Sequence, residues 1–560
     1  MKFKHLLFFT LLFSGSIIAI YPQEEQPEDA AVETTPEVIE ETTEEIVTAV
    51  PEFVEDENTV YVIREINFDI DGRTRPFALL MNSDLVIGEY IIGKTNFDKY
   101  LSKQRQTLNN QRVLDEVKIE YFPGEIEEDG ALAINLLVHV KDSWNFVIVP
   151  YPKYDSNSGW SITLKARDYN FFGTMNTLFF DFGYQYDNSN DHIFNIAFGT
   201  EFPFQALGLD WSVRLDNTFI YTVGDPLYYM GIAGLSVKLP WRTTTFTVGF
   251  NQYLVADEDN SAENKKVYGL GDIFEGVYGA TELYASWRIP INLEVGPFGK
   301  LYYTPRISER INYPYSEMDE SRKPLTRLSH SLGFGRINWE GNYRKGLNAS
   351  ISNAFNIYAD RSDAPFDITL NGEAIFHWPF NKYIGISSRL KYRQWWHWSD
   401  TRSSLPPTNG YGDGWMPNHS AGDVLRGIID DDIWANYMLS LNIDLPIRVL
   451  RFWPSDWFNN NKLRLFNFEM HIVPFLDLAL IEGPYNKLVT PHNDGIRFRL
   501  DDMLVTTGLE VIVFPAFFRS IYIRASIGYD LKKIAKDGLP LKWGFFPEWN
   551  EIFIGLDHYY

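Results

Sequence analysis

Apolar and polar residues alternate one by one over long stretches of residues 143–560. Between Leu209 and Asp216 every second residue is apolar, and the residues between them are Asp, Ser, Arg and Asp. The same period of two recurs in 174–186 and 521–531. Because successive side chains of a strand point to opposite faces, this pattern predicts β-strands with one apolar and one polar face.

The length of these runs separates two kinds of β protein. Strands in soluble sheets usually have about five or six residues, whereas runs of roughly ten match tilted strands that cross a membrane. Alternating charged side chains are tolerated where they face a wet lumen while the apolar face contacts lipid. The pattern therefore predicts a mainly β fold, a transmembrane antiparallel β-barrel over 143–560, with a soluble all-β protein as the alternative.

The connections between the alternating runs are of two lengths. Short ones, such as Phe202-Pro203-Phe204 and Pro379-Phe380-Asn381, alternate with long polar ones at 256–271, 310–326 and 401–423. Short turns at one end and long loops at the other are typical of bacterial barrels. Counting the runs gives about eighteen strands.

Residues 59–142 show a different pattern, in which strand-like and helix-like runs both occur, and they predict a small α/β domain. The predicted order is strand, helix, helix, strand, strand, with Pro76 opening the first helix and Thr95 or Asn96 the second. The three strands are expected at 62–70, 117–121 and 131–142.

The N-terminal 58 residues fall into two segments. Residues 1–22 have a short basic start and a run of apolar residues too short for a ~30 Å hydrocarbon core, which predicts a secretory signal peptide. Residues 23–58 carry fourteen acidic and no basic residues, which predicts an extended, disordered tether, with a binding arm as the alternative.

Charge and composition exclude several function classes. The net charge is −24, of which the tether supplies −14. No basic stripe for nucleic acid is present, and the absence of cysteine excludes disulfide scaffolds and thiolate sites. The 16% of aromatic residues fits rings at a membrane interface. Since no catalytic motif occurs, we expect neither enzyme activity nor a cofactor or metal.

Several short segments together resemble the BamA-like outer-membrane protein assembly family, of the bacterial surface antigen type. The small domain resembles a POTRA domain, in 66–72 and 114–119. Asp168-Tyr169-Asn170-Phe171-Phe172-Gly173 resembles the family's turn after the second barrel strand, which on its own is an ordinary tight turn. The end of the chain, with Gly555, His558 and Tyr560, resembles a C-terminal insertion signal, although His558 stands where an aromatic is usual.

The most specific segment is Val424-Leu425-Arg426-Gly427-Ile428, before an alternating run. It resembles the tip of the family's sixth extracellular loop, which folds back into the barrel, where the arginine pairs with acidic residues of the wall. Ile428 departs from the aromatic expected there, which leaves the loop's packing partner open.

We expect Arg426 to pair with Asp477, and with Glu510 second. In a hydrated lumen this pair would contribute about 1 kcal/mol. The charge exchange Arg426→Asp with Asp477→Arg is expected to restore what each single variant loses.

The resemblance implies a barrel of sixteen strands, which we prefer to eighteen, in the outer membrane with the POTRA-like domain and the tether in the periplasm. It also implies insertion, assembly or translocation of proteins without ATP, by strand addition at the POTRA edge and at the seam between 144–150 and 552–560. The expected partners are outer-membrane lipids, unfolded client proteins, and accessory periplasmic proteins or lipoproteins. A passive channel or porin, and a surface antigen acting through its loops, are the alternatives.

Overall fold

The structure is a computed structural model of the chain. It describes residues 56–155, 159–186, 190–242, 244–257, 276–314, 325–358, 366–397, 425–428, 437–482, 500, 503–516, 522–537 and 550–556. The predicted signal peptide and the tether up to Glu55 lie outside these residues. Among the helices of the described part, none is both long and apolar enough to cross a membrane.

The first domain is a four-stranded sheet covered by two helices. Its elements are β1 (Val60–Asp71), α2 (Pro76–Met81), β2 (Tyr90–Ile92), α3 (Lys94–Asn109), β3 (Leu114–Ile126) and β4 (Leu132–Asp142). The sheet order is β2-β1-β4-β3, with β1 parallel to β4 and the other pairs antiparallel. The predicted order omitted β2, because three residues are too few to show a period.

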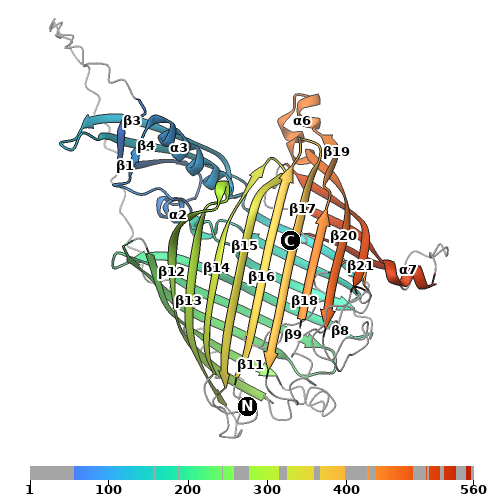
Figure 1. Cartoon of the computed structure of the whole chain (residues 1–560). Coiled ribbons are helices and arrows are strands. Elements are labelled where there is room, and N and C mark those ends of the chain that lie inside the picture. The colour runs from blue at the N-terminus through green and yellow to red at the C-terminus, as the bar shows by residue number, and fades with distance from the viewer. Residues whose placement is uncertain are drawn as a thin grey trace, which may run out of the picture. The chain divides into compact units, whose positions relative to one another are not determined.

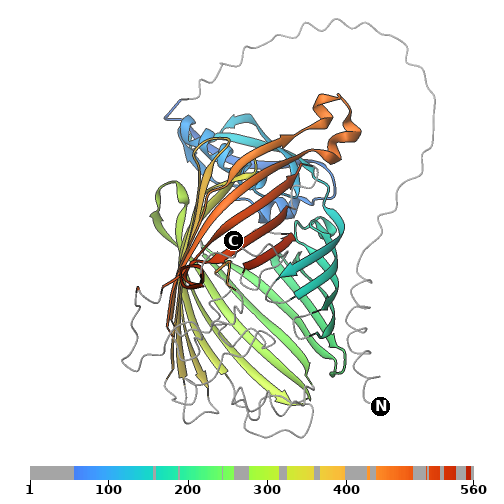
Figure 2. The ribbon, with the colours of Figure 1, turned by 90° about the vertical axis from the view of Figure 1, so that its right-hand side faces the viewer.

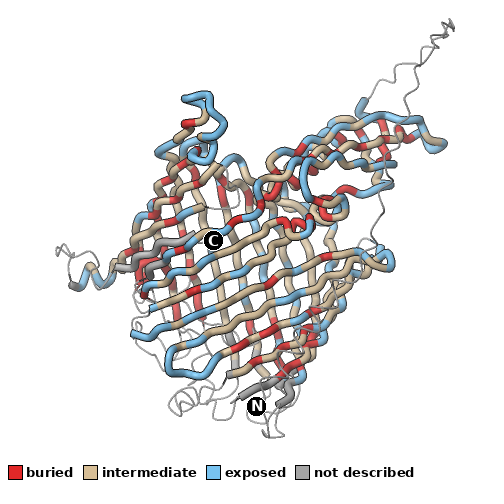
Figure 3. The backbone as a smooth tube through the Cα atoms, turned by 180° about the vertical axis from the view of Figure 1, so that it is seen from behind, coloured by how far each residue is buried: buried red, intermediate tan, exposed pale blue. Residues whose placement is uncertain are grey.

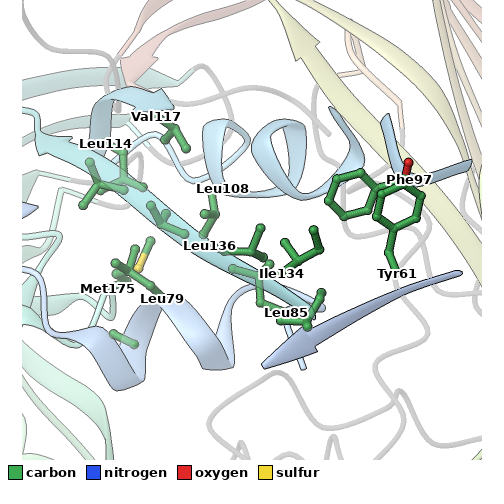
Figure 4. Packing of buried hydrophobic residues seen from close by; sticks show 14 of the residues in the cluster. Tyr61, Leu79, Leu85, Phe97, Leu108, Leu114, Val117, Ile134, Leu136 and Met175 are labelled. Carbon is green, nitrogen blue, oxygen red and sulfur yellow. The ribbon is translucent and has the colours of Figure 1, made fainter. Parts of the chain in front are cut away.

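The core of this domain lies between the sheet and the helices. Apolar positions of β1 and β4 meet Leu79 of α2 and Phe97 and Leu108 of α3, all fully buried. Figure 4 shows that Met175 lies beside Leu79 in the same cluster. Met175 belongs to the turn after the second strand of the large sheet, so one side chain of that turn completes the core of the small domain.

The second and larger part is an antiparallel sheet that curls round on itself (Figure 1). Its strands in chain order are β5 (Phe146–Asp155), β6 (Gly159–Asp168), β7 (Leu178–Tyr186), β8 (His192–Ala206), β9 (Leu209–Thr222), β10 (Tyr228–Trp241), β11 (Thr244–Asp257), β12 (Gly276–Glu294), β13 (Lys300–Pro314), β14 (Leu325–Glu340), β15 (Tyr343–Tyr358), β16 (Phe366–Pro379), β17 (Gly385–His397), β18 (Tyr437–Asp444), β19 (Ile447–Phe452), β20 (Phe468–Glu482), β21 (Leu504–Pro515), β22 (Ile523–Asp530) and β23 (Asn550–Leu556).

The described connections between these strands contain five short helices. They are η1 (Phe171–Gly173), η2 (Gly296–Phe298), α6 (Pro454–Trp457), η4 (Asn461–Phe466) and α7 (Leu531–Asp537). β18 and β19 pair with successive parts of β20, so they form one strand interrupted at Pro446. Counted this way, the described sheet has eighteen strands. The preferred number of sixteen is wrong, and the number from the alternating runs is the one observed.

The two faces of the sheet differ as the alternation predicts. Large apolar side chains such as Ile307, Leu328 and Phe355 are exposed on the outside, whereas the inside carries polar and charged groups such as Glu282 and Asn356. In Figure 3 the buried residues are scattered along the strands of this sheet and gathered in the small domain. An apolar exterior and a polar interior confirm the barrel fold.

The predicted turn at Phe202-Pro203-Phe204 is not a turn. These residues lie inside β8, whose ladder with β7 ends at Thr200 while its ladder with β9 continues to Ala206. Pro203 therefore sits where one side of the strand has no partner, so its missing N–H is tolerated. The reversal follows at Leu207-Gly208, both with positive φ.

The last strand meets the first at a short seam. β23 pairs with β5 at two positions, Phe553 with Asp155 and Ile554 with Tyr154, whereas β5 and β6 pair at ten. Figure 2 shows the last strands, in red, beside the first strands, in teal. The described pairs lie near the end of β5 at Asp155; residues 557–560, which the predicted seam with 144–150 would use, lie outside the described residues. Within the described residues, the start of β5 is unpaired on this side.

Candidate functional site

A short piece of the long loop between β17 and β18 lies against the inner wall of the barrel. Of this loop the structure describes Leu425 to Ile428, all four of them buried. With eighteen strands, it joins the thirteenth to the fourteenth, which makes it the seventh connection at its end of the barrel and not the sixth. The loop returns to the wall formed by β18, β20, β21 and β22.

Arg426 is bound chiefly by Asp477 of β20. Its Nε donates to Oδ2 at 2.9 Å and its Nη2 to Oδ1 at 2.7 Å, which is the bidentate arrangement of a guanidinium and a carboxylate. The backbone N–H of Arg426 also donates to Oδ2 of Asp477, at 3.0 Å. One carboxylate therefore fixes both the side chain and the backbone of the loop tip.

Two further acidic groups surround the guanidinium. Nη2 of Arg426 donates to Oδ1 of Asp444 at 2.6 Å, and Nη1 lies 3.8 Å from Oε2 of Glu510. Glu510 is in turn 3.4 Å from Nη1 of Arg524 on β22. The guanidinium also stacks on the ring of Phe475, 3.8 Å from its centroid. Charges of both signs are thus clustered on four neighbouring strands.

Burial changes the energy expected of this pair. Arg426 is 4% exposed and Asp477 is fully buried, so neither lies in the hydrated lumen assumed from the sequence. The estimate of about 1 kcal/mol, which applies to an ion pair exposed to water, is therefore wrong for this buried pair. In a buried cluster, removal of one partner leaves the other charge uncompensated, at a cost of about 3–5 kcal/mol.

Gly427 brings the loop backbone against the backbone of β22. Its φ is +97°, a conformation that favours glycine. A Cβ at this position would lie 2.7 Å from the carbonyl carbon of Gly528, and a Cβ on Gly528 would lie 2.6 Å from Cα of Gly427. Both glycines are needed for this close approach, although only Gly427 was singled out from the sequence.

Ile428, the residue that departs from the family pattern, packs into an apolar cluster. With Leu425 it contacts inward side chains near the loop end of the wall, namely Met438, Ala479, Ile481 and Leu504. The wall residues are small or aliphatic, so an aliphatic side chain fits where the family has an aromatic. This cluster is the packing partner of Ile428, which the sequence alone did not identify.

The segment Asp168 to Gly173 was predicted as a local tight turn, and in the structure it also contacts the small domain. Asn170 is fully buried; its Nδ2 donates to Oγ1 of Thr74 at 2.7 Å and to Oδ2 of Asp142 at 3.1 Å, and its Oδ1 accepts from the N–H of Met175 at 2.9 Å. Asp168 forms an ion pair with Arg73 at 2.9 Å. The turn therefore joins the barrel to the small domain.

Gly173 completes this junction. Its φ is +72°, and a Cβ there would overlap the carbonyl oxygen of Arg73. Its own carbonyl accepts from the N–H of Arg75 at 2.9 Å. On the other side, Asp142 accepts from the N–H groups of Arg73 and Thr74, at 2.7 and 3.1 Å. The local sequence predicted a turn but could not indicate these distant partners.

Of the C-terminal residues singled out, Gly555 lies in β23 and pairs with Arg524. His558 and Tyr560 lie outside the described residues. The structure adds three groups that the sequence analysis did not assign to the site, namely Asp444, Phe475 and Gly528. Asp444 had a usable signal, since it shares the inward face of its strand with Ser440 and Asn442.

No family model matches the chain, and no curated protein matches it. Solved structures similar to it include BamA from Haemophilus ducreyi lacking POTRA domains 1–3, at 13% identity and a TM-score of 0.38, covering 88% of this chain and 84% of that one.

Two others are CdiB from Acinetobacter baumannii and CdiB from Escherichia coli. Both are 13% identical, with TM-scores of 0.43 and 0.45, and cover 89% of this chain and 74% and 76% of theirs. At this level these are similarities only.

Proposed function

We propose that this chain is an outer-membrane protein of BamA-like type, which assists the insertion, assembly or translocation of other proteins without ATP. The observation that carries the proposal is the arginine loop held inside the barrel beside a weak seam. Arg426 and Gly427 tie together β18, β20, β21 and β22. The next strand is β23, which forms one side of the seam.

We infer that the barrel wall separates most easily at the seam. A backbone hydrogen bond contributes about 0.5–1.5 kcal/mol net. Within the described residues the seam has two residue pairs, against seven between β22 and β23. An opened seam exposes strand edges, to which an extended client segment can add as a further strand. The loop would keep the flank of the seam in place while the edge exchanges partners.

The small domain offers a second edge of this kind. In the order β2-β1-β4-β3, the long strand β3 pairs with β4 and has no second neighbour among the described strands. An extended client segment could add there before it reaches the barrel. Identification of this domain as a POTRA domain, with its place in the periplasm, is part of the proposal, as are the client proteins and any accessory lipoprotein.

One observation favours the passive channel as the second candidate. A hollow of about 700 Å³ lies on the inner wall of β8 to β14, and it is lined by polar groups including Glu201, Arg214, Asn251 and Arg327. A polar hollow of this size suits water and small solutes. A channel, however, has no need of an arginine loop bound to its wall.

Depletion of the protein in its host tests the proposal. We expect the levels of other outer-membrane barrels, or of secreted proteins, to fall before growth stops, and a wild-type copy to restore them. Variants that release the loop, as we expect of Asp477→Asn, should fail to restore them. Unchanged levels of both, together with ion conductance in planar bilayers that does not depend on Asp477, would favour the channel and contradict the proposal.

A further inference from the structure

One connection at the small-domain end of the barrel is much longer than the others and is rich in exposed aromatic residues. Between β19 and β20 the chain forms α6 and η4, whereas β14 and β15, for comparison, are joined by Gly341 and Asn342. We call residues 447–467 the aromatic knob. Figure 1 and Figure 2 both show it projecting beyond the ends of the neighbouring strands.

The knob is a defined structure with an unusual surface. Asn467 and Ser455 hydrogen-bond to each other twice, at 2.6 and 3.2 Å, and the side chain of Asn460 caps η4. Four large apolar side chains are nevertheless more than half exposed: Trp457 (61%), Phe458 (71%), Leu465 (54%) and Phe466 (61%). A packed scaffold that exposes this much apolar surface marks an interaction surface.

The register of the hairpin shows which way part of this surface faces. Phe452 pairs with Phe468, which lies on the side of β20 opposite to the lumen-facing Glu469 and Asp477. The ring of Trp457 packs edge-on against Phe452, with centroids 5.0 Å apart. Trp457 therefore extends the outer, apolar face of the barrel and does not point into the lumen.

The charge of the knob is opposite to that of the whole chain. Residues 447–467 contain four basic residues against Asp456, a net charge of +3 in a protein of −24. Two of the four, Arg448 and Arg451, lie 3.3 and 4.0 Å from the lumen-facing Glu469, so the other two, Lys462 and Arg464, supply the outward positive charge. Lys462 and Arg464 are exposed, although Arg464 also lies 3.7 Å from Asp115 of the small domain. Aromatic and basic residues together are the composition of segments that bind anionic membrane surfaces.

We propose that the aromatic knob binds the surface of the same membrane that holds the barrel, through its anionic lipid headgroups. β19 runs five residues beyond the bridge between Ile384 and Ile447, which is about 17 Å of strand, or about 13 Å along the membrane normal at a usual tilt. With this bridge taken as the hydrocarbon boundary, the end of β19 stands a few ångströms beyond a headgroup layer of about 5–8 Å, a distance that long aromatic and basic side chains can span. The inference rests on the proposed membrane location of the barrel.

Site-specific labelling tests the inference, because the chain has no cysteine. The whole protein is refolded into phosphatidylcholine vesicles, with or without phosphatidylglycerol, carrying a fluorophore at Asn461→Cys. Lipids with a headgroup nitroxide should quench this label several-fold more than a label at Glu125→Cys on β3, and more strongly when phosphatidylglycerol is present. Lys462→Glu should remove the extra quenching, and Trp457→Ser with Phe458→Ser should lower quenching in both lipids.

A third label distinguishes an error in the knob inference from an error in the proposed membrane location of the barrel. Ile307 is half exposed on the outer face of β13, so a label at Ile307→Cys should be quenched by nitroxides on the acyl chains. If it is quenched while the Asn461 label is quenched no more than the Glu125 label, the knob inference is wrong and the proposed function stands. If Ile307 is not quenched, the membrane barrel and the knob contact are both contradicted.

Discussion

Asp477→Asn should release the arginine loop from the barrel wall. The change keeps the shape of the side chain but removes the charge that meets Arg426 through two side-chain hydrogen bonds and one backbone hydrogen bond. Asp444 and Glu510 remain beside the guanidinium, so we take the lower end of the cost of breaking a buried ion pair, about 3 kcal/mol. That cost raises the population of the released loop about 100-fold.

Trypsin measures this population directly, because the probe is Arg426 itself. In the bound loop the residue is 4% exposed, and cleavage after it requires release. Where opening and closing are faster than cleavage, the rate of cleavage follows the open population. Mass spectrometry of the fragment that ends at Arg426 should therefore show a rate about 100-fold higher for Asp477→Asn than for the wild-type chain.

Glu373→Gln is the matched control. Glu373 pairs with Arg389 on the inner wall, at 2.7 Å, and is partly exposed. Among the described residues, it forms no ion pair with the loop tip. Loss of such a pair costs at most about 1 kcal/mol, and cleavage after Arg426 should hardly change. Equal cleavage rates in Asp477→Asn and the wild-type chain, with the barrel folded, would refute the view that Asp477 holds the loop.

Three further outcomes follow from the same geometry. Gly528→Ala should release the loop, as seen by the trypsin assay, whereas Gly372→Ala, whose Cβ would meet nothing closer than 3.7 Å, should not. Asn170→Ala should cost about 1–3 kcal/mol at the junction and raise trypsin cleavage in the 73–75 turn, whereas Asn176→Ala should leave cleavage there unchanged. The exchange Arg426→Asp with Asp477→Arg should restore folding only in part, because it leaves the contacts to Asp444 and Glu510 unmatched.

The sequence was most informative where the pattern is long and local. Alternation over whole strands predicted the barrel, its polar interior and even its number of strands, which the resemblance then lowered to sixteen. The same alternation placed Asp477 and Glu510 on the inner face. Burial of the cluster was not predicted, because it depends on a loop that returns from outside the pattern to cover these groups.

Contacts between distant segments were beyond the sequence. The residues around Asn170 predict only a tight turn. Its hydrogen-bond partners, Thr74 and Asp142, lie 96 and 28 residues away in the sequence. Likewise, the sequence shows Gly528 only as one residue of an alternating strand and gives no sign that Gly427 packs against it. The aromatic knob was missed for another reason: its aromatic residues follow neither the period of a strand nor that of a long helix.

The most direct test of the account is a lock across the seam. Tyr154→Cys with Ile554→Cys joins a cross-strand pair of β5 and β23 in a chain without other cysteines, while Val213→Cys with Leu235→Cys joins β9 and β10 as the control. The assay is the assembly of newly made outer-membrane barrels in cells that depend on each variant, with and without reductant. We predict that the oxidised seam stops assembly, that reduction restores it, and that the control assembles normally. Full assembly through an oxidised seam would contradict the proposed function.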